Sequence, residues 1–253
     1  ERLLFLHYFH LCMYMFLETQ LKRENILLYL LHELLSILFH HQNCNYKSQF
    51  YNMYDLYLEN PRNVFNRVLE AHDIRYKDNE ILELVEVYRE HTPDVHFYPD
   101  VKPALYALKD RGKKLGLLSD GYAVAQRKKL TVLGVNGKKM FDKILITDEL
   151  GRDYWKPDPR PFIMMKEAFM VDWSDMVYVG DNPEKDFFIG RDLPIMTVRI
   201  IRDNGVYTDR PYLEGYRETA RINSLNDLIK LIKLYKYRLI VCLGKAGIRR
   251  HSL

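Results

Sequence analysis

Between residues 101 and 235 the sequence alternates between short apolar runs and longer amphipathic segments, and this alternation constrains the fold more than any other feature. Short runs rich in Val, Ile and Leu are typical of buried strands, whereas apolar residues at helical spacing favour helices that cover a sheet. Repeated strand–helix units of this length predict an α/β fold with a Rossmann-like, doubly wound parallel sheet. The pattern predicts helices over Val101–Arg111, Val124–Leu133, Pro159–Phe169, Pro183–Arg191 and Asn223–Tyr235, and strands over Lys114–Leu118, Lys143–Thr147, Met176–Val179 and Ile195–Ile200.

The region before this alternation has a different pattern, because it contains helical segments without intervening strands. Its first part, Leu11–Leu17, has the composition of a buried strand. Helices are predicted over Glu24–Phe39, Phe50–Leu58, Val64–Glu70 and Asn79–His91. We therefore expect a first core strand in residues 1–21, an inserted helical cap in 22–95, the α/β core in 96–237 and a C-terminal extension in 238–253. In the extension, Arg238–Gly247 is predicted to form a strand and a glycine turn, and its place in the fold is left open.

The charge balance of the chain argues against binding to nucleic acid. Its 38 basic and 34 acidic residues give a formal net charge of +4. Because these charges are mixed along the chain and form no long basic stripe, nucleic acid is not the expected partner. The sequence leaves the oligomeric state open.

Two further features bear on the location of the protein. Its three cysteines are far apart and have no metal-ligand spacing, so we expect a reduced, cytoplasmic protein. The apolar run Leu3–Leu17 is interrupted by His7 and His10 and is shorter than the ~20 residues that a membrane helix needs. We therefore expect no association with a membrane. The first residue is Glu1, and we expect the natural chain to begin further upstream.

Polar residues follow the predicted strand that ends at Leu118. Ser119, Asp120 and Gly121 stand where this strand passes into a helix. In an open α/β sheet, ligands bind beyond the carboxyl ends of the strands. A hydroxyl group and nearby backbone N–H groups at such a place can donate to phosphate oxygens. The alternative is that Ser-Asp-Gly is only a turn, which is a common use of these residues.

A lysine follows the next predicted strand. Lys156 stands in the segment Lys156-Pro-Asp-Pro, just before a predicted helix. Such a cation could neutralise the charge of a phosphoryl group or keep a nearby carboxylate ionised. The alternative is an ordinary surface lysine.

Two carboxylates follow the predicted strand Met176–Val179. Asp181 comes directly after Gly180, and Asp186 lies five residues further on. Carboxylate oxygens beyond a buried strand are the ligands that Mg²⁺ prefers. The alternative is that Asp181 and Asn182 cap the following helix.

These three motifs, in this order and each at a successive strand end, resemble the second, third and fourth motifs of the haloacid dehalogenase superfamily. The surrounding segments agree: LGLLSDGY, FDKILITDELGRDYWKPDPRPF and VYVGDNPEKDFFIGRDLPIMTVRI. The resemblance is to phosphatases and nucleotidases that carry a helical cap after the first strand. It implies that Ser119 binds phosphate with Asp120 and Gly121 beside it, that Lys156 bridges phosphate and nucleophile, and that Asp181 and Asp186 bind Mg²⁺. The family usually has Asn at the position of Asp120, whose charge is expected to weaken phosphate binding.

The first motif of the family is missing. It consists of two aspartates, one residue apart, after the first strand; the first attacks phosphorus and the second is the general acid and base. The best register places Phe16 at the nucleophile and Glu18 at the acid/base, and the first aspartate of the chain is Asp55. Three explanations remain open: an altered N-terminal sequence, a protein that binds without cleaving, or another carboxylate acting as nucleophile.

The sequence therefore predicts a Mg²⁺-dependent phosphatase that acts on a small phosphate ester, such as a nucleotide or a sugar phosphate. The alternative is a non-catalytic protein that retains the phosphate site. The substrate is not predicted, because cap sequences carry no readable code.

Overall fold

The computed structural model describes residues 56, 59–60, 62–71, 73, 75–90, 92–93, 95–135, 139–203, 205, 207–233, 239–242 and 248–250. The chain divides into two compact units, residues 1–94 with 251–253, and residues 95–250. The predicted strand within Leu11–Leu17 and the candidate acid/base Glu18 lie outside the described residues.

The described elements alternate as the apolar pattern predicts from residue 101 onward. The helices are α4 (Val64–Ala71), α5 (Asp78–Glu90), α6 (Val101–Asp110), α7 (Ala123–Val132), α8 (Arg160–Phe169) and α9 (Leu225–Lys233). The strands are β1 (Val95–Phe97), β2 (Lys114–Ser119), β3 (Lys143–Ile146), β4 (Met176–Gly180), β5 (Met196–Ile200), β6 (Ala220–Ile222), β7 (Leu239–Cys242) and β8 (Ile248–Arg250). Short 3-10 helices are η2 (Thr147–Glu149), η3 (Arg152–Tyr154), η4 (Trp173–Asp175), η5 (Phe188–Gly190) and η6 (Leu213–Gly215).

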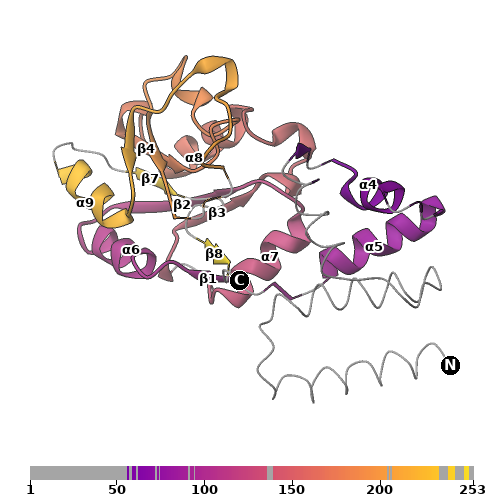
Figure 1. The fold of residues 1–253 in the computed structure, drawn as a ribbon. Coiled ribbons are helices and arrows are strands. Elements are labelled where there is room, and N and C mark those ends of the chain that lie inside the picture. Colours follow the sequence, from indigo (N-terminus) through magenta and orange to yellow (C-terminus); the bar gives the residue numbers. More distant parts are fainter. Residues whose placement is uncertain are drawn as a thin grey trace. The chain divides into compact units, whose positions relative to one another are not determined.

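The larger unit is built on a sheet with the strand order β3-β2-β7-β4-β5-β6. All pairs of neighbouring strands are parallel, so their carboxyl ends lie at one edge. Strands β1 and β8 form a separate antiparallel pair. The parallel sheet predicted from the strand–helix alternation is confirmed (Figure 1).

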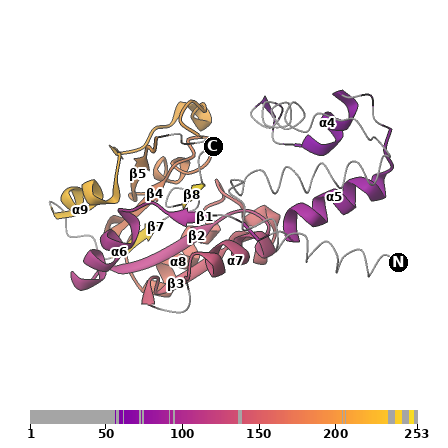
Figure 2. The ribbon, with the colours of Figure 1, turned by 60° about the horizontal axis from the view of Figure 1, so that its bottom comes forward.

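The central place between β2 and β4 is taken by β7, from the C-terminal segment that the sequence pattern left unplaced. Cys242 at the end of β7 stands opposite both Leu117 of β2 and Val179 of β4. Since β7 pairs with both strands, β2 and β4 do not pair with each other (Figures 1 and 2). The core strand expected within Leu11–Leu17 lies outside the described residues and stays a prediction.

Helices cover both faces of the sheet, because side chains alternate between the faces along each strand. On one face, Leu115 and Leu117 of β2 and Val177 and Val179 of β4 join a core with α6 and α9. On the other face, the core contains Leu118 and Tyr178 together with Phe162 and Met165 of α8. Gly116 lets α8 approach the sheet, since a Cβ there would lie 3.2 Å from the Met165 sulfur. This arrangement is the doubly wound architecture that the sequence predicts.

The smaller unit contains α4 and α5, which lie side by side (Figure 2). Leu69 and Leu84 are fully buried and pack with Phe65, Tyr76 and Ile81. Within the part of the chain that the structure describes, no helix is long and apolar enough to cross a lipid bilayer.

The helix predicted over Pro183–Arg191 is wrong. This segment consists of turns and the short η5. The Asp186 side chain folds back and accepts hydrogen bonds from the backbone N–H groups of Asp181 and Asn182. These bonds hold the segment against the end of β4, where a regular helix could not keep them.

Candidate functional site

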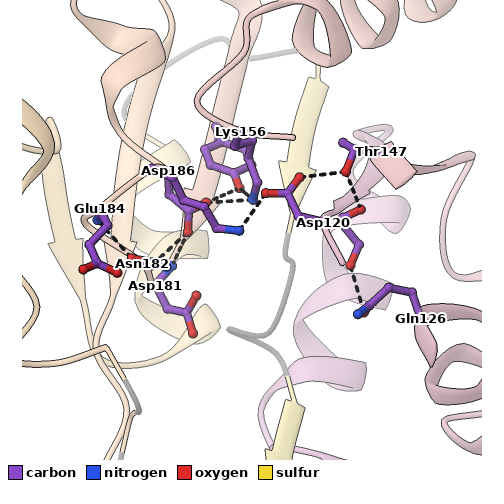
Figure 3. Close-up of polar contacts among 11 residues, drawn as sticks. Asp120, Gln126, Thr147, Lys156, Asp181, Asn182, Glu184 and Asp186 are labelled. Atoms are coloured by element: carbon purple, nitrogen blue, oxygen red, sulfur yellow. Dashed lines mark hydrogen bonds and ion pairs between the residues drawn. The ribbon is translucent and has the colours of Figure 1, made fainter. Parts of the chain in front are cut away.

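Charged side chains gather at the carboxyl edge of the sheet, where the loops after β2, β3 and β4 meet (Figure 3). Asp120 follows β2, Lys156 lies in the loop between β3 and α8, and Asp186 lies in the loop after β4. The sequence-predicted motifs therefore meet at one edge, as expected for parallel strands.

A buried ion pair joins the second and third of these loops. The Lys156 Nζ donates to Asp186 Oδ1 at 2.7 Å and to the Tyr178 hydroxyl at 2.6 Å, and this hydroxyl donates to the same Asp186 oxygen at 3.0 Å. Both charged side chains are only 3% exposed. Tyr178 is a fully buried residue of strand β4, and the sequence pattern did not indicate a polar role for it.

Mutual attraction keeps both members of this pair charged. Burial by itself lowers the pKa of Lys156, but Asp186, Tyr178 and Asp120 together outweigh burial and raise this pKa well above its usual range. Burial by itself raises the pKa of Asp186, and Lys156 reverses this effect, so the pKa of the carboxyl is lowered. Burial and the same carboxylate raise the pKa of the Tyr178 hydroxyl well above its usual range. The lysine therefore stays an ammonium and the tyrosine a neutral donor.

Glycine at the end of β4 makes room for Asp186. A Cβ at Gly180 would lie 2.6 Å from Asp186 Oδ2 and 2.7 Å from its Cγ, closer than real Cβ contacts come. The same Asp186 oxygen accepts hydrogen bonds from the backbone N–H groups of Asp181 at 3.1 Å and Asn182 at 2.8 Å. Asp186 is thus fixed between the strand end and the lysine.

Replacing Gly180 by Ala is expected to destabilise the protein by about 1–3 kcal/mol, the usual cost of overpacking a tight interior. The added methyl group must displace the Asp186 carboxylate from its amide donors. Urea unfolding of the Gly180→Ala variant would measure the loss. The matched control is Gly134→Ala. A Cβ at Gly134 would meet no atom within 4 Å, so the loss of stability in this variant comes only from placing alanine at a φ of +68°. Equal losses in the two variants would contradict the steric argument.

A second ion pair links the loops after β2 and β4. The Lys185 Nζ lies 2.7 Å from Asp120 Oδ2, and the other oxygen of Asp120 accepts a hydrogen bond from the Thr147 hydroxyl at 2.9 Å. The Asp120 side chain is 2% exposed and that of Lys185 is 29% exposed. Sequence reasoning missed Lys185, although its place directly before Asp186 was a signal that could have identified it.

The two ammonium groups lie close enough to repel each other. Burial lowers the pKa of Lys185, and the charge of Lys156 lowers it further, while Asp120 acts in the opposite direction. Asp120 also contributes to the raised pKa of Lys156. Two cations and two anions thus form one connected cluster across the strand ends.

Ser119 and Gly121 lie on the α7 side of this cluster. The Ser119 hydroxyl is buried and donates to the Gln126 side chain at 3.1 Å. Gly121 has a φ of +112°, and a Cβ there would lie 2.7 Å from Gln126 Nε2. Glycine at position 121 is therefore favoured by the backbone conformation, and a larger residue would also displace the Gln126 amide. The Ser119 hydroxyl thus has its hydrogen-bond acceptor on helix α7, at Gln126, rather than at the Lys156 side of the cluster.

The described carboxylates do not by themselves form a magnesium site. All four donors to Asp186 occupy its two oxygens, and both oxygens of Asp120 are likewise hydrogen-bonded. The Asp181 carboxylate points away from that of Asp186 (Figure 3). Among the described residues, no group of three His, Cys, Asp or Glu side chains could hold a metal ion. Asp186 is paired with Lys156 in this structure, and the binding of Mg²⁺ by Asp181 and Asp186 stays a prediction.

Comparison with known proteins adds three findings. A family model described as haloacid dehalogenase-like hydrolase matches residues 32–200. The chain is 39% identical over 112 residues to a glyceraldehyde 3-phosphate phosphatase of Methanopyrus kandleri, covering 44% of this chain and 46% of that protein. It is 38% identical over 104 residues to a phosphoserine phosphatase of Thermus thermophilus, covering 41% of this chain and 40% of that protein.

The fold is also similar to a solved structure. A HAD phosphatase from Thermococcus onnurineus superposes with a TM-score of 0.53 at 24% identity, covering 85% of this chain and 91% of that chain. The chain spans about half the length, or less, of the curated relatives that it matches.

Proposed function

Because the chain belongs to the haloacid dehalogenase-like hydrolase family, we propose that it binds small phosphate monoesters at the carboxyl edge of its sheet. The observation that carries this proposal is the pair of ammonium groups, Lys156 and Lys185, held at the ends of parallel strands. A phosphate dianion at this edge would face two cations in surroundings where water screens charges weakly. The named activities of the curated relatives, on two different small phosphate esters, support the same substrate class.

The family relationship supports hydrolysis of the bound ester as the function of this site. Lys156 would neutralise charge on the phosphoryl group, and the backbone N–H groups near Gly121 would bind its oxygens. Glu18 remains the proposed general acid and base, by its place in the sequence alone. The helical region 22–95 is proposed to select the substrate, and the cysteine spacing supports a cytoplasmic location.

The family resemblance is the basis for proposing that this site binds magnesium. Of the two carboxylates expected to bind it, Asp186 is engaged by Lys156, and Asp181 remains as a candidate ligand. Among the described residues, no group of three His, Cys, Asp or Glu side chains completes a magnesium site. We expect phosphate binding to persist in EDTA, because both ammonium groups belong to the protein.

Binding without turnover is the second candidate function, and one observation favours it. The strand beside β2 and β4 is β7, and the residues after it in the sequence are Leu243-Gly-Lys-Ala-Gly247, without a carboxylate. By resemblance, the nucleophilic aspartate of the family directly follows the strand next to these motifs. The chain lacks an aspartate both there and near Phe16.

Calorimetric titration with inorganic phosphate in EDTA tests the proposed site. The wild-type chain is expected to bind phosphate, and the Lys156→Gln/Asp186→Asn variant to bind about tenfold or more weakly, since it lacks one ammonium. Changing both residues leaves no unpaired buried charge. Lys230→Gln is the control, because this lysine is exposed on α9. Equal affinities in all three proteins would refute the site.

A further inference from the structure

The Lys185–Asp120 ion pair bridges strands that are not neighbours. Asp120 follows β2 and Lys185 lies beyond β4, and β7 separates these two strands. β7 ends at Cys242, opposite Leu117 and Val179, whereas Asp120 and Lys185 lie in the loops that follow β2 and β4. The pair therefore joins the two loops beyond the end of the central strand, at the place where a phosphate would meet Lys156.

The negative charge of Asp120 stabilises the charged forms of two ammonium groups, those of Lys185 and Lys156. One oxygen lies 2.7 Å from Lys185 Nζ, and the carboxylate is also near enough to favour the charged form of Lys156. The Thr147 hydroxyl, donating to the other oxygen at 2.9 Å, fixes the carboxylate in this orientation. With a side-chain exposure of 2%, Asp120 is an anion held by the protein rather than a solvated surface group.

We propose that Asp120 is an internal anion that competes with the phosphate group for Lys185 and so sets the affinity of the site. The proposal rests on the proposed function, because it needs phosphate to bind beside Lys156 and Lys185. A phosphate that approaches Lys185 must either displace the Asp120 carboxylate or bind against its charge. An Asn at this position, which keeps the shape and the hydrogen bond with Thr147 but not the charge, would leave Lys185 for the ligand.

Phosphate titration of four proteins tests the competition: the wild type, Asp120→Asn, Lys185→Gln and the double variant. We expect Asp120→Asn to bind inorganic phosphate at least about tenfold more tightly than the wild type. Lys185→Gln should bind more weakly than the wild type. In the double variant most of the gain should vanish, because the contested ammonium is absent. Thermal unfolding of each variant, with and without phosphate, gives an independent measure of binding by its stabilisation of the folded state.

Asp148→Asn is the matched control for a general change in charge. Asp148 also lies at the carboxyl edge of the sheet, but it accepts a hydrogen bond from the backbone N–H of Ala123 at 2.9 Å rather than pairing with a lysine. If Asp120→Asn binds no more tightly than the wild type, or gains no more than Asp148→Asn, the competition is refuted while the site itself stands. If none of the proteins binds phosphate, both this inference and the proposed function fall.

Discussion

Replacing Lys156 by Met is expected to lower the free energy of unfolding by about 3–5 kcal/mol, the usual cost of removing one partner from a buried ion pair. The substitution leaves the Asp186 carboxylate uncompensated where only 3% of its side chain reaches solvent. Tyr178 and two backbone N–H groups still donate to Asp186, but none of them carries a positive charge. Equilibrium unfolding in urea at pH 7 measures the loss.

The double variant Lys156→Met/Asp186→Asn distinguishes the loss of the ion pair from the cost of leaving one buried charge without a partner. It should recover much of the loss, because no charge remains buried without a partner. Lys230→Met, which removes an exposed cation from a surface pair, should produce no measurable change. A loss in Lys156→Met no greater than in Lys230→Met would show that the pair is not buried as described.

The pH dependence of stability follows from the same pair. Asp186 has a pKa lowered from 3.8, so its contribution is present above this pH and is lost as pH falls through the lowered value. Lys156 has a pKa raised above 10.5, so its contribution is present below this pH and is lost as pH rises through the raised value. The stability difference between the wild type and the double variant should therefore be constant near neutral pH.

If the site binds without turnover, the protein is expected to hydrolyse p-nitrophenyl phosphate with excess Mg²⁺ no faster than a Lys156→Ala control. Enzymes accelerate phosphate-monoester hydrolysis by up to about 10²¹-fold, and in this family, by resemblance, that acceleration depends on an aspartate nucleophile. The described carboxylates nearest to the lysines, Asp120 and Asp186, each have both oxygens held by hydrogen bonds, and they follow β2 and β4 rather than the strand that precedes the family's nucleophile. The ammonium groups can bind the ester, but the aspartate pair of the family's first motif is missing from the sequence near Phe16.

Restoring aspartates would test where the missing motif belongs. Phe16→Asp/Glu18→Asp should raise the rate if the first strand lies within Leu11–Leu17 and reaches this site. Leu243→Asp/Lys245→Asp should raise it instead if the strand that precedes the nucleophile is β7. Robust Mg²⁺-dependent turnover by the unmodified chain, abolished by Asp181→Ala, would contradict the expectation and show that another carboxylate attacks.

The sheet was predictable because its strands are apolar runs of the right length separated by helices, and this pattern depends only on local sequence. The same pattern could not predict the place of β7. Residues 239–242 are apolar in sequence, but they pair with strands that lie far back in the chain, Leu239 standing opposite Lys114 of β2 and Met176 of β4. The predicted helix at Pro183–Arg191 failed for a different reason, since the Asp186 side chain makes local hydrogen bonds with the backbone N–H groups of Asp181 and Asn182 that helix periodicity does not encode.

The candidate site was predictable in location but not in detail. Lys156 and Asp186 were identified from their positions after strands, and they do meet. Their direct pairing, with the hydroxyl of Tyr178 as a third member, depends on side-chain geometry that the spacing does not encode. The expectation that the charge of Asp120 weakens phosphate binding stays a prediction, and its ion pair with Lys185, 65 residues away in the sequence, could not be read from local spacing.

The central position of β7 has a consequence for the order in which this domain can assemble. Without β7, the chain up to α9 contains two partial sheets, β3-β2 and β4-β5-β6, each with an unpaired strand edge. Such edges are places where a strand of another chain can add. Because the joining strand follows both halves in the sequence, closure of the sheet is a late event that requires long-range contacts. Pulsed hydrogen exchange would reveal this order, since the amides of β2 that face β7 should gain protection together with those of β7 and not before.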